Sequence, residues 1–300
     1  MRIVLFALPG PMALPVLQGL LTLPVNVIGL VHPAPAGMPA LTQLPAATPA
    51  RNPTLLAPPT AATIADAAGI PRYAVRRNAT TAIAEQLRRQ KVDLVIVACW
   101  PWRIPAALLE IPRYGWLNLH PSPLPELRGP EPLFWALRLG WTRTAMTMHL
   151  MDAEFDHGPI VSQEWFDLPP GERLHSLETL AGQCAATMLP TALSHISSAE
   201  WRPSSQAAGG SYFPSPRTQD FVFTAEWSVQ RAYAFVCAIA EWGILFTFIA
   251  ADGQRVQLTD AVEYQPHKHL AMPVVEQDGR LALQLCDGVL IGITPDCTKR

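Results

Sequence analysis

An amide and an imidazole, Asn118 and His120, stand two positions apart in the short apolar stretch Trp116–His120. Such a stretch is typical of a β-strand, in which side chains at positions i and i+2 point to the same face. Three prolines follow at once: Pro121, Pro123 and Pro125. Proline cannot donate a hydrogen bond to a sheet, so we expect these residues to end the strand and to fix the loop. The two polar side chains would then be held rigidly side by side.

Carboxylates follow about thirty residues later, in the stretch HLMDAEFDHGPIV. A second strand is expected to end at Met151, which places Asp152, Glu154 and Asp156 in the next loop. A carboxylate that approaches His120 would favour the charged imidazolium. An imidazolium and an amide N–H aimed at one point would stabilise a developing oxyanion. The carboxylate would also accept a proton from an attacking amine or water.

Other interpretations of these residues stay open. An asparagine or histidine at a strand end is often a structural group that completes a turn. Four side chains could suggest a metal site: His149, Asp152, Asp156 and His157. No H-E-x-x-H or similar paired spacing is present, so we expect no metal.

The surrounding pattern predicts an α/β fold. Ile3–Leu8, Val25–Val31 and Val92–Cys99 are apolar runs typical of buried parallel strands, and Leu14–Leu21 between the first two is typical of a helix. We expect an open, parallel-rich Rossmann-like sheet with helices on both faces. Ligands bind at the carboxyl ends of the strands in such sheets. Neither G-x-G-x-x-G nor G-x-x-x-x-G-K occurs, so those nucleotide phosphate sites are not expected.

A change of composition predicts a domain boundary. Residues 197–216 are rich in Ser, Pro, Gly and Ala and are interpreted as a linker between a catalytic domain (1–196) and a small C-terminal β-rich domain (217–300). Short strands there, including one over Arg255–Glu263, suggest a barrel-like, OB-like arrangement. Earlier in the chain, Pro33–Pro59 is interpreted as a long surface excursion whose only charge is Arg51.

Composition limits the class of partner and compartment. Net charge is −2, with 49% hydrophobic and 15% charged residues, which indicates a folded chain without a basic excess for nucleic acid. From residue 201 onward there are eight Lys/Arg against ten Asp/Glu. Five scattered cysteines lack metal-ligand spacing and are typical of free thiols in a reducing, cytoplasmic environment. The N-terminal apolar run is too short for a signal peptide and too interrupted by proline for a membrane span.

Three blocks, taken in order, resemble a known family. They are N-L-H-P-S-P-L-P-E-L-R-G, P-L-F-W-A-L-R-L-G and M-D-A-E-F-D-H-G-P-I-V. Together they resemble the formyltransferases that use 10-formyltetrahydrofolate, over most of residues 1–195. The resemblance implies that Asn118, His120 and Asp156 are catalytic. Asn118 and protonated His120 would hold the tetrahedral oxyanion, while Asp156 orients the imidazole and relays protons.

The resemblance also implies binding residues. The folate donor would lie against the loop ACWPWRIP, lined by four residues: Trp100, Trp102, Arg103 and Ile104. Asp152 would help to close the other side of the pocket. Ser122 would support the turn near the site and, with Arg128 and Gly129, would face the acceptor substrate. No metal is implied.

The acceptor is less well defined than the donor. A small β domain after the catalytic domain resembles the branch of the family that formylates methionyl-tRNA. Glu126 departs from that branch, where a basic residue is usual, and the 33–59 segment has only one of the expected basic residues. A small amine, such as a nucleotide-linked amino sugar, is therefore an alternative acceptor, and hydrolysis of the folate donor is another. An inactive folate-binding module is the non-enzymatic alternative.

Overall fold

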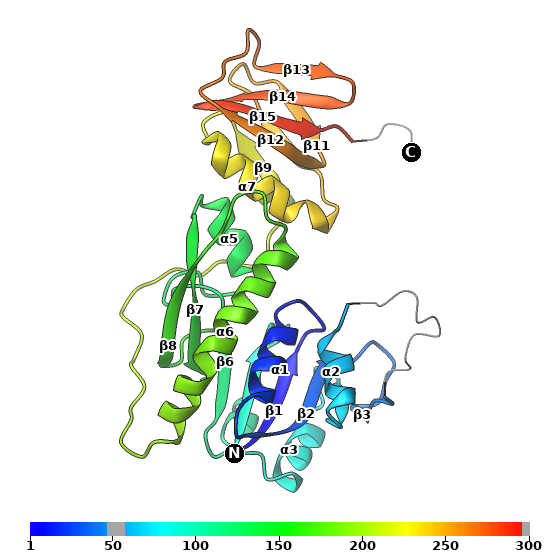
Figure 1. The fold of residues 1–300 in the computed structure, drawn as a ribbon, viewed down its shortest axis with the longest axis vertical. Helices are drawn as coiled ribbons and strands as arrows, with labels where there is room; N and C mark the ends of the chain where they lie inside the picture. The colour runs from blue at the N-terminus through cyan, green and yellow to red at the C-terminus, as the bar shows by residue number, and fades with distance from the viewer. Residues whose placement is uncertain (47–57, 296–300) are drawn as a thin grey trace. The chain divides into compact units, whose positions relative to one another are not determined.

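The computed structural model describes residues 1–46 and 58–295 (Figure 1). The chain divides into two compact units. Unit 1 contains Met1–Arg128, Ala145–Phe166 and Glu178–Tyr212, and unit 2 contains Gly129–Thr144, Asp167–Leu177 and Phe213–Arg300. The chain thus passes between the units several times. The expected division into a catalytic domain (1–196), a linker (197–216) and a C-terminal domain (217–300) remains a proposal.

An eight-stranded sheet forms the centre of unit 1, in the order β3-β4-β2-β1-β5-β6-β7-β8. Its strands are β1 (Arg2–Ala7), β2 (Asn26–Pro33), β3 (Leu41–Gln43), β4 (Arg72–Val75), β5 (Leu94–Ala98), β6 (Trp116–His120), β7 (Arg143–Leu150) and β8 (Ile160–Asp167). The pairs from β4 to β6 are parallel, while β3 pairs antiparallel with β4 and β7 antiparallel with β6. The predicted α/β class with a parallel-rich sheet is confirmed.

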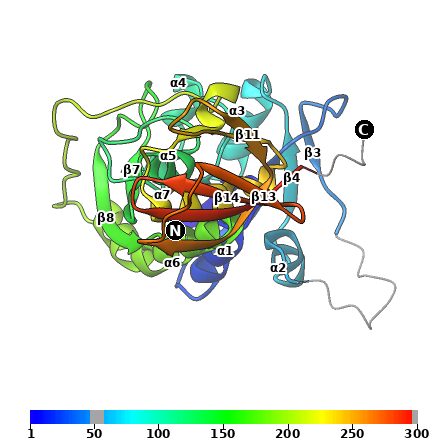
Figure 2. The same cartoon turned by 90° about the horizontal axis from the view of Figure 1, so that it is seen from above.

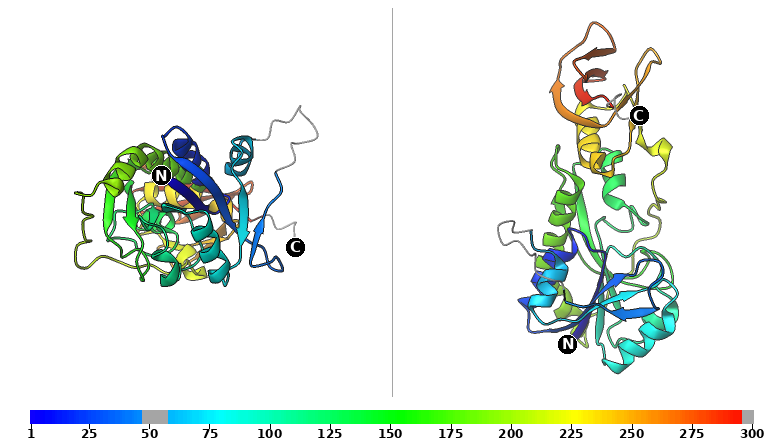
Figure 3. Two further views of the ribbon diagram at one scale, coloured as in Figure 1. Left: turned by 90° about the horizontal axis from the view of Figure 1, so that it is seen from below. Right: turned by 90° about the vertical axis from the view of Figure 1, so that its right-hand side faces the viewer.

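Helices cover both faces of this sheet (Figure 3). On one face lie α1 (Ala13–Leu21), α2 (Ala61–Ala67) and α6 (Leu174–Ser197), whose apolar side chains share a buried core with the strands. The other face carries α3 (Thr80–Arg89) and α4 (Ala106–Leu109), which pack on a second core. On α6, the buried residues recur every three or four positions, at Ala181, Ala185, Met188 and Ala192, as expected for one helical face.

The strand order creates a natural ligand crevice. β1 lies between β2 and β5. The chain adds β2, β3 and β4 on one side of β1 and then reverses to add β5 and β6 on the other side. Ligands in open α/β sheets bind beyond the carboxyl ends of the strands at such a reversal. β5 and β6 both end beside this position, and the loops that follow them carry the residues singled out from the sequence.

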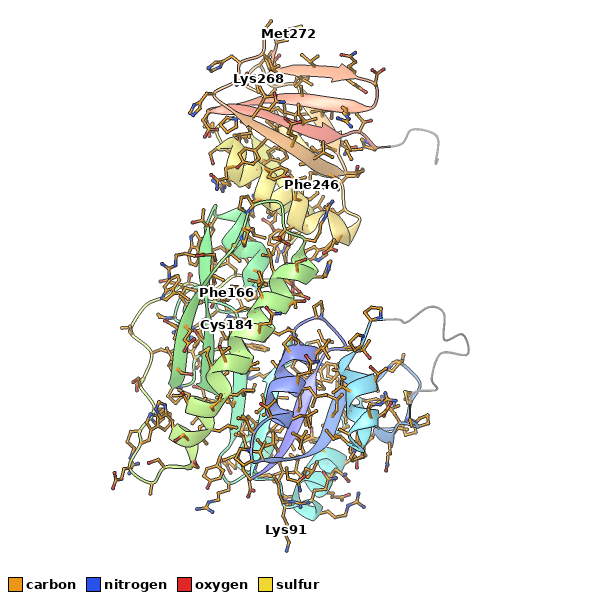
Figure 4. All side chains as sticks on the ribbon, in the orientation of Figure 1. Lys91, Phe166, Cys184, Phe246, Lys268 and Met272 are labelled. Atoms are coloured by element: carbon orange, nitrogen blue, oxygen red, sulfur yellow. The ribbon has the colours of Figure 1, made fainter. Side chains whose placement is uncertain are left out.

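Unit 2 combines helices with two small sheets. Its helices are α5 (Pro132–Arg138), α7 (Val229–Ile239) and the 3-10 turns η1 (Thr218–Phe221) and η2 (Ala240–Trp242). β9 (Val222–Thr224), β10 (Phe246–Ile249) and β11 (Arg255–Leu258) form one sheet; β12 (Asp260–Pro266), β13 (Val274–Gln277), β14 (Arg280–Leu285) and β15 (Gly288–Ile293) form the other. Phe246, labelled in Figure 4, is fully buried among aromatic rings. Arg173 and Asp260 form an ion pair at 2.6 Å.

Two expectations from the sequence need correction. The single strand expected over Arg255–Glu263 is two strands that break at Thr259, because β11 pairs with β10 and β12 pairs with β15 in the other sheet. The 33–59 segment is not wholly an excursion, since β3 adds an edge strand there. Residues 47–57, including Arg51, lie outside the described residues.

The cysteines that lie in the described residues form no disulfide with one another. These are Cys99, Cys184, Cys237 and Cys286. Burial raises the pKa of Cys237 to about 11, and the neighbouring Asp260 acts in the same direction. A thiol with so high a pKa stays protonated near neutral pH and is a poor nucleophile.

None of the helices within residues 1–46 and 58–295 is long and apolar enough to cross a membrane.

Close packing of α6 against the start of α1 leads to a stability prediction. A Cβ atom on Gly182 would lie 2.7 Å from the Met12 carbonyl oxygen, which belongs to the backbone and cannot turn away. We expect Gly182→Ala to lower the free energy of unfolding by about 1–3 kcal/mol. The steric cost of the added Cβ atom would thus outweigh the ~1 kcal/mol by which alanine stabilises a helix relative to glycine.

The matched control is Gln183→Ala, one residue further on an exposed part of the same helix. Its unfolding free energy, measured by urea denaturation, should change by less than about 0.5 kcal/mol. A Gly182→Ala protein as stable as the unaltered chain would contradict the packing described here.

Candidate active site

The side chains of Asn118 and His120 both lie on strand β6 and point to one side of the sheet. Trp116, Asn118 and His120 occupy alternate positions, and Trp116 packs into the core beneath α3 and α4. The adjacent β5 is parallel and pairs Val97 with Asn118. Asn118 and His120 therefore lie over the second core at the carboxyl end of the sheet. The stretch after Trp116 folds as predicted.

Asp156 approaches both side chains from the loop after β7. Its Oδ1 accepts a hydrogen bond from Asn118 Nδ2 at 3.2 Å and lies 3.7 Å from His120 Nδ1. The side chains of His120 and Asp156 are only 7% and 10% exposed. The structure therefore brings the three predicted residues together in a largely water-excluded place, where electrostatic interactions are strong.

A fourth side chain, His149, completes the cluster. Antiparallel pairing of β6 with β7 places it directly opposite Asn118. Its Nε2 lies 3.1 Å from Asn118 Nδ2 and 3.6 Å from Asp156 Oδ1, and its side chain is 1% exposed. The sequence suggested His149 only as a candidate metal ligand. Its position depends on the register between two strands, which no local pattern reveals.

Hydrogen-bond chemistry assigns the orientations of these groups. A carboxylate accepts only, so the Asn118 atom facing Asp156 is the NH2 group. The same NH2 group meets His149 Nε2, which must then accept, leaving His149 Nδ1–H to donate to the Leu150 carbonyl at 3.2 Å. Both hydrogens of the Asn118 amide are thus directed at protein acceptors. An oxyanion that binds Asn118 must replace one of these two contacts.

His120 presents one nitrogen to the site. Its Nε2–H donates to the Leu127 carbonyl at 2.9 Å, because a carbonyl oxygen can only accept. Nδ1 is therefore the nitrogen on the side of Asp156. A proton on Nδ1 makes the ring an imidazolium that can donate to a negatively charged group near Asn118 and Asp156.

Three of the seven described non-glycine residues with positive φ lie in the loops around this cluster. Cys99, Leu127 and Asp156 follow β5, β6 and β7 and have positive φ angles of 55°, 56° and 55°. Left-handed backbone is unfavourable for residues with a Cβ atom and is common at functional sites. Gly158 allows the Asp156 loop to close, because a Cβ there would lie 1.6 Å from the Leu150 carbonyl oxygen.

The residues predicted for the folate pocket lie in two loops of unit 1. Trp100 and Trp102 pack edge to face at 4.8 Å beside the second core, and Trp100 Nε1 is buried without a hydrogen-bond partner among the described residues. Arg103 is exposed, whereas Ile104 is 3% exposed and belongs to the core. Asp152 is exposed on the other loop. Their roles in folate binding remain predictions.

Residues predicted for the acceptor side are held within the protein. Ser122 is fully buried and donates to the Glu126 carbonyl at 2.7 Å, as expected for a turn support. Arg128 is 8% exposed and donates to Gln206 and to the Gly209 carbonyl. Gly129 is buried with a φ of 100°. Their contact with a substrate remains a prediction.

A cavity of about 440 Å³ adjoins the Asp156 loop. It is bordered by Arg128, Asp152, His157 and residues 205–209. Among the described residues, no group of three or more His, Cys, Asp or Glu side chains is arranged to hold a metal ion.

Comparison with known proteins identifies the family. The family described as Formyl transferase matches residues 38–193, more than half of the chain. A methionyl-tRNA formyltransferase of Synechococcus sp. (strain JA-2-3B'a(2-13)) is 30% identical over 273 residues, covering 89% of this chain and 79% of that protein. The chain therefore belongs to the formyl transferase family. Matches to some other methionyl-tRNA formyltransferases cover about half of those proteins, 48% and 46% of their lengths.

Solved structures share the fold across both units. An N-formyltransferase from Helicobacter canadensis, solved in complex with folinic acid and dTDP-3-aminofucose, superposes with a TM-score of 0.62 at 14% identity, covering 98% of this chain and 99% of that one. Methionyl-tRNA formyltransferase from Clostridium thermocellum gives a TM-score of 0.57 at 13% identity, covering 97% and 99%. At these identities the likeness concerns the fold alone.

The position of His149 leads to a mutational prediction. His149→Leu removes the acceptor of one Asn118 N–H and frees the amide to turn. We expect turnover in a formyl-transfer assay to fall by about tenfold to a hundredfold, since small misplacements of reacting groups cost rates of this order. His149→Gln restores an acceptor and should recover part of the loss.

The control is the unfolding midpoint of each variant, which should remain well above the assay temperature. Full turnover by His149→Leu would show that Asn118 needs no support from β7.

Proposed function

We propose that the chain transfers a formyl group from 10-formyltetrahydrofolate to a primary amine. The observation that carries this proposal is the convergence of Asn118, His120 and Asp156 in one shielded cluster. Family membership supports the reaction type. The folinic acid bound in the Helicobacter neighbour supports a folate as donor.

Each group has a defined part in the proposed reaction. The amine nitrogen attacks the formyl carbon, forming a C–N bond and placing negative charge on the former carbonyl oxygen. Asn118 Nδ2–H and protonated His120 Nδ1–H donate to that oxygen. Asp156 accepts the proton that the attacking amine loses. The bond from the formyl carbon to N10 of the folate then breaks, and N10 takes up a proton as it leaves.

This mechanism predicts a separation between binding and turnover. His120→Ala removes the cationic donor but leaves Trp100, Trp102 and the folate-facing loops in place. We expect turnover to fall by roughly a hundredfold or more, while donor affinity, measured by fluorescence titration, stays nearly unchanged. An alanine variant with full activity would refute the oxyanion role of His120. Loss of donor binding as well would place His120 in the binding pocket instead.

The first candidate acceptor is the methionyl amine of initiator tRNA. The sequence relatives described above are named for that activity, and the Synechococcus protein matches through both units. A tRNA is held largely through its phosphates, which are bound by lysine and arginine. Acceptor choice therefore depends on which basic side chains in this chain are available.

Several basic residues of the chain are already engaged. Arg72 pairs with Asp66 at 2.8 Å and is 10% exposed, and Arg128 is bound to Gln206. Arg231 lies 3.6 Å above the Trp227 ring and donates to a backbone carbonyl. Fewer guanidinium groups thus remain for a phosphate backbone. This observation favours the second candidate, a small amine such as a nucleotide-linked amino sugar, which is the class of compound represented by the dTDP-3-aminofucose in the Helicobacter complex.

Direct competition between acceptors tests these alternatives. The protein is incubated with 10-formyltetrahydrofolate and, separately, charged initiator tRNA, a nucleotide-linked amino sugar, or water alone. Formyl methionyl-tRNA as the main product supports the first candidate, and a formylated sugar supports the second. Release of formate in every sample indicates hydrolysis. Donor binding without any product indicates an inactive folate-binding module and overturns the proposed reaction.

Salt dependence gives a further prediction about tRNA. Each neutralised phosphate contributes a log–log slope of roughly −0.9 for a duplex. With Arg72, Arg128 and Arg231 engaged, we expect a shallow slope, reduced further by Arg76→Ala or Arg217→Ala, which alter exposed residues of units 1 and 2. Tight tRNA binding whose affinity falls steeply with salt would show that the other arginines of the chain are sufficient to bind the tRNA phosphates.

A further inference from the structure

The segment Ser204–Ser211, termed the strap, lies against two loops of the candidate site. From its composition it was expected to be part of a linker between two domains. It begins beside the first residue of β8, where backbone hydrogen bonds join Ser204 and Ile160 in both directions at 2.7 and 3.0 Å, and it is the yellow-green segment beyond β8 in Figures 1 and 2. The strap therefore belongs to unit 1, together with the site.

One side chain of the strap, Gln206, joins both loops. Its Nε2 donates to the carbonyl oxygens of Asp156 at 2.7 Å and Gly158 at 2.9 Å. Its Oε1 accepts from Nη2 and Nε of Arg128, at 2.7 and 3.1 Å. An arginine only donates and a carbonyl only accepts, so the amide can take only one orientation. Glutamine supplies donor and acceptor together, which neither glutamate nor a basic residue can do.

The far end of the strap holds the loop that orients His120. Ser211 Oγ accepts from the backbone N–H of Leu127 at 3.0 Å, and the Ser211 carbonyl accepts from the backbone N–H of Arg128 at 2.9 Å. The carbonyl of Leu127 is the acceptor for His120 Nε2–H. The strap thus holds the backbone of Leu127, whose carbonyl accepts from His120, and also the backbone of Asp156.

Both tied residues have strained backbone. Leu127 and Asp156 are left-handed, and such conformations persist only where surrounding contacts enforce them. The Gln206 bond to the Asp156 carbonyl acts directly on the strained peptide. Without it, the Asp156 loop can relax toward ordinary backbone angles, which would turn the carboxylate away from Asn118.

We infer that Gln206 is a positioning residue, which acts through the Asp156 backbone to aim the carboxylate at Asn118 and His120. This inference rests on the proposed formyl transfer. It also gives Arg128 a defined part: the guanidinium fixes the Gln206 amide, which fixes the loop. Glu126 contributes at the other end of the strap, where its carboxylate accepts from the Ser211 hydroxyl.

The test uses Gln206→Glu in the full chain. Glutamate can keep the contact with Arg128, so the buried guanidinium retains a partner, but it cannot donate to the two loop carbonyls. We expect kcat to fall by about tenfold to a hundredfold, with little change in KM for the folate donor. Gln183→Glu is the matched control, since it adds the same charge on an exposed part of α6. Ser204→Ala, which alters an exposed strap residue that does not border the cavity, is the second control.

A double-mutant cycle with Asp156→Asn separates positioning from general destabilisation. If Gln206 acts through the Asp156 carboxylate, Gln206→Glu should cost almost nothing further once that carboxylate is gone. Independent losses that multiply would overturn the inference. So would an unchanged kcat, or an equal loss in Gln183→Glu.

Hydrogen–deuterium exchange of peptides covering residues 152–161 gives a readout independent of turnover. Gln206→Glu should speed exchange in this loop, while both controls should leave it as in the unaltered chain. Unchanged exchange would overturn the inference even if activity fell. If the unaltered protein transfers formyl to none of the acceptors, the proposed function fails and the catalytic role of Gln206 fails with it, whereas faster exchange would still locate the loop contact.

Discussion

The shielded carboxylate of Asp156 is the constraint around which unit 1 is organised. Its Oδ1 accepts a hydrogen bond from Asn118 Nδ2 and lies 3.7 Å from His120 Nδ1, which is a donor when it carries a proton. A carboxylate that is only 10% exposed must receive hydrogen bonds or opposite charge, because burial without them is costly. Strand β6 supplies both of these groups, and β7 places His149 beside Asn118. The geometry of the candidate site and the stability of the buried charge therefore depend on the same contacts.

The loops that surround this carboxylate contain unfavourable backbone. Cys99, Leu127 and Asp156 each adopt left-handed angles, at a cost of about 1–3 kcal/mol for each residue. Contacts between segments distant in sequence offset this cost, including the β1–β5 pairing before Cys99 and the strap against Leu127 and Asp156. Rigid strands thus support loops that could not keep these conformations alone. The site is preorganised because many weak contacts converge on a few strained residues.

The sequence predicted what depends on local periodicity. Asn118 and His120 share a face because of the two-residue repeat of a strand, and the helices around the main sheet follow from their apolar spacing. Asp156 was placed by resemblance, since loop geometry has no simple periodic signal. His149 and Gln206 were missed for a related reason. His149 depends on the register of two antiparallel strands, and Gln206 lies in a stretch whose composition is typical of a linker. The short strands β3 and β9 exist mainly through pairing with neighbours, which composition does not reveal.

The arrangement around Asn118 separates the chemistry of transfer from the choice of acceptor. Both amide hydrogens meet protein acceptors, so in the proposed reaction a formyl oxygen must displace Asp156 or His149 as it binds. Displacing Asp156 would free its carboxylate to receive a proton from the attacking nucleophile, while His149 continues to hold the other hydrogen. This exchange requires only a carbonyl oxygen and a nucleophile with a proton to lose. It is therefore the same for a methionyl amine, an amino sugar or water, and selection among them must come from residues beyond the cluster.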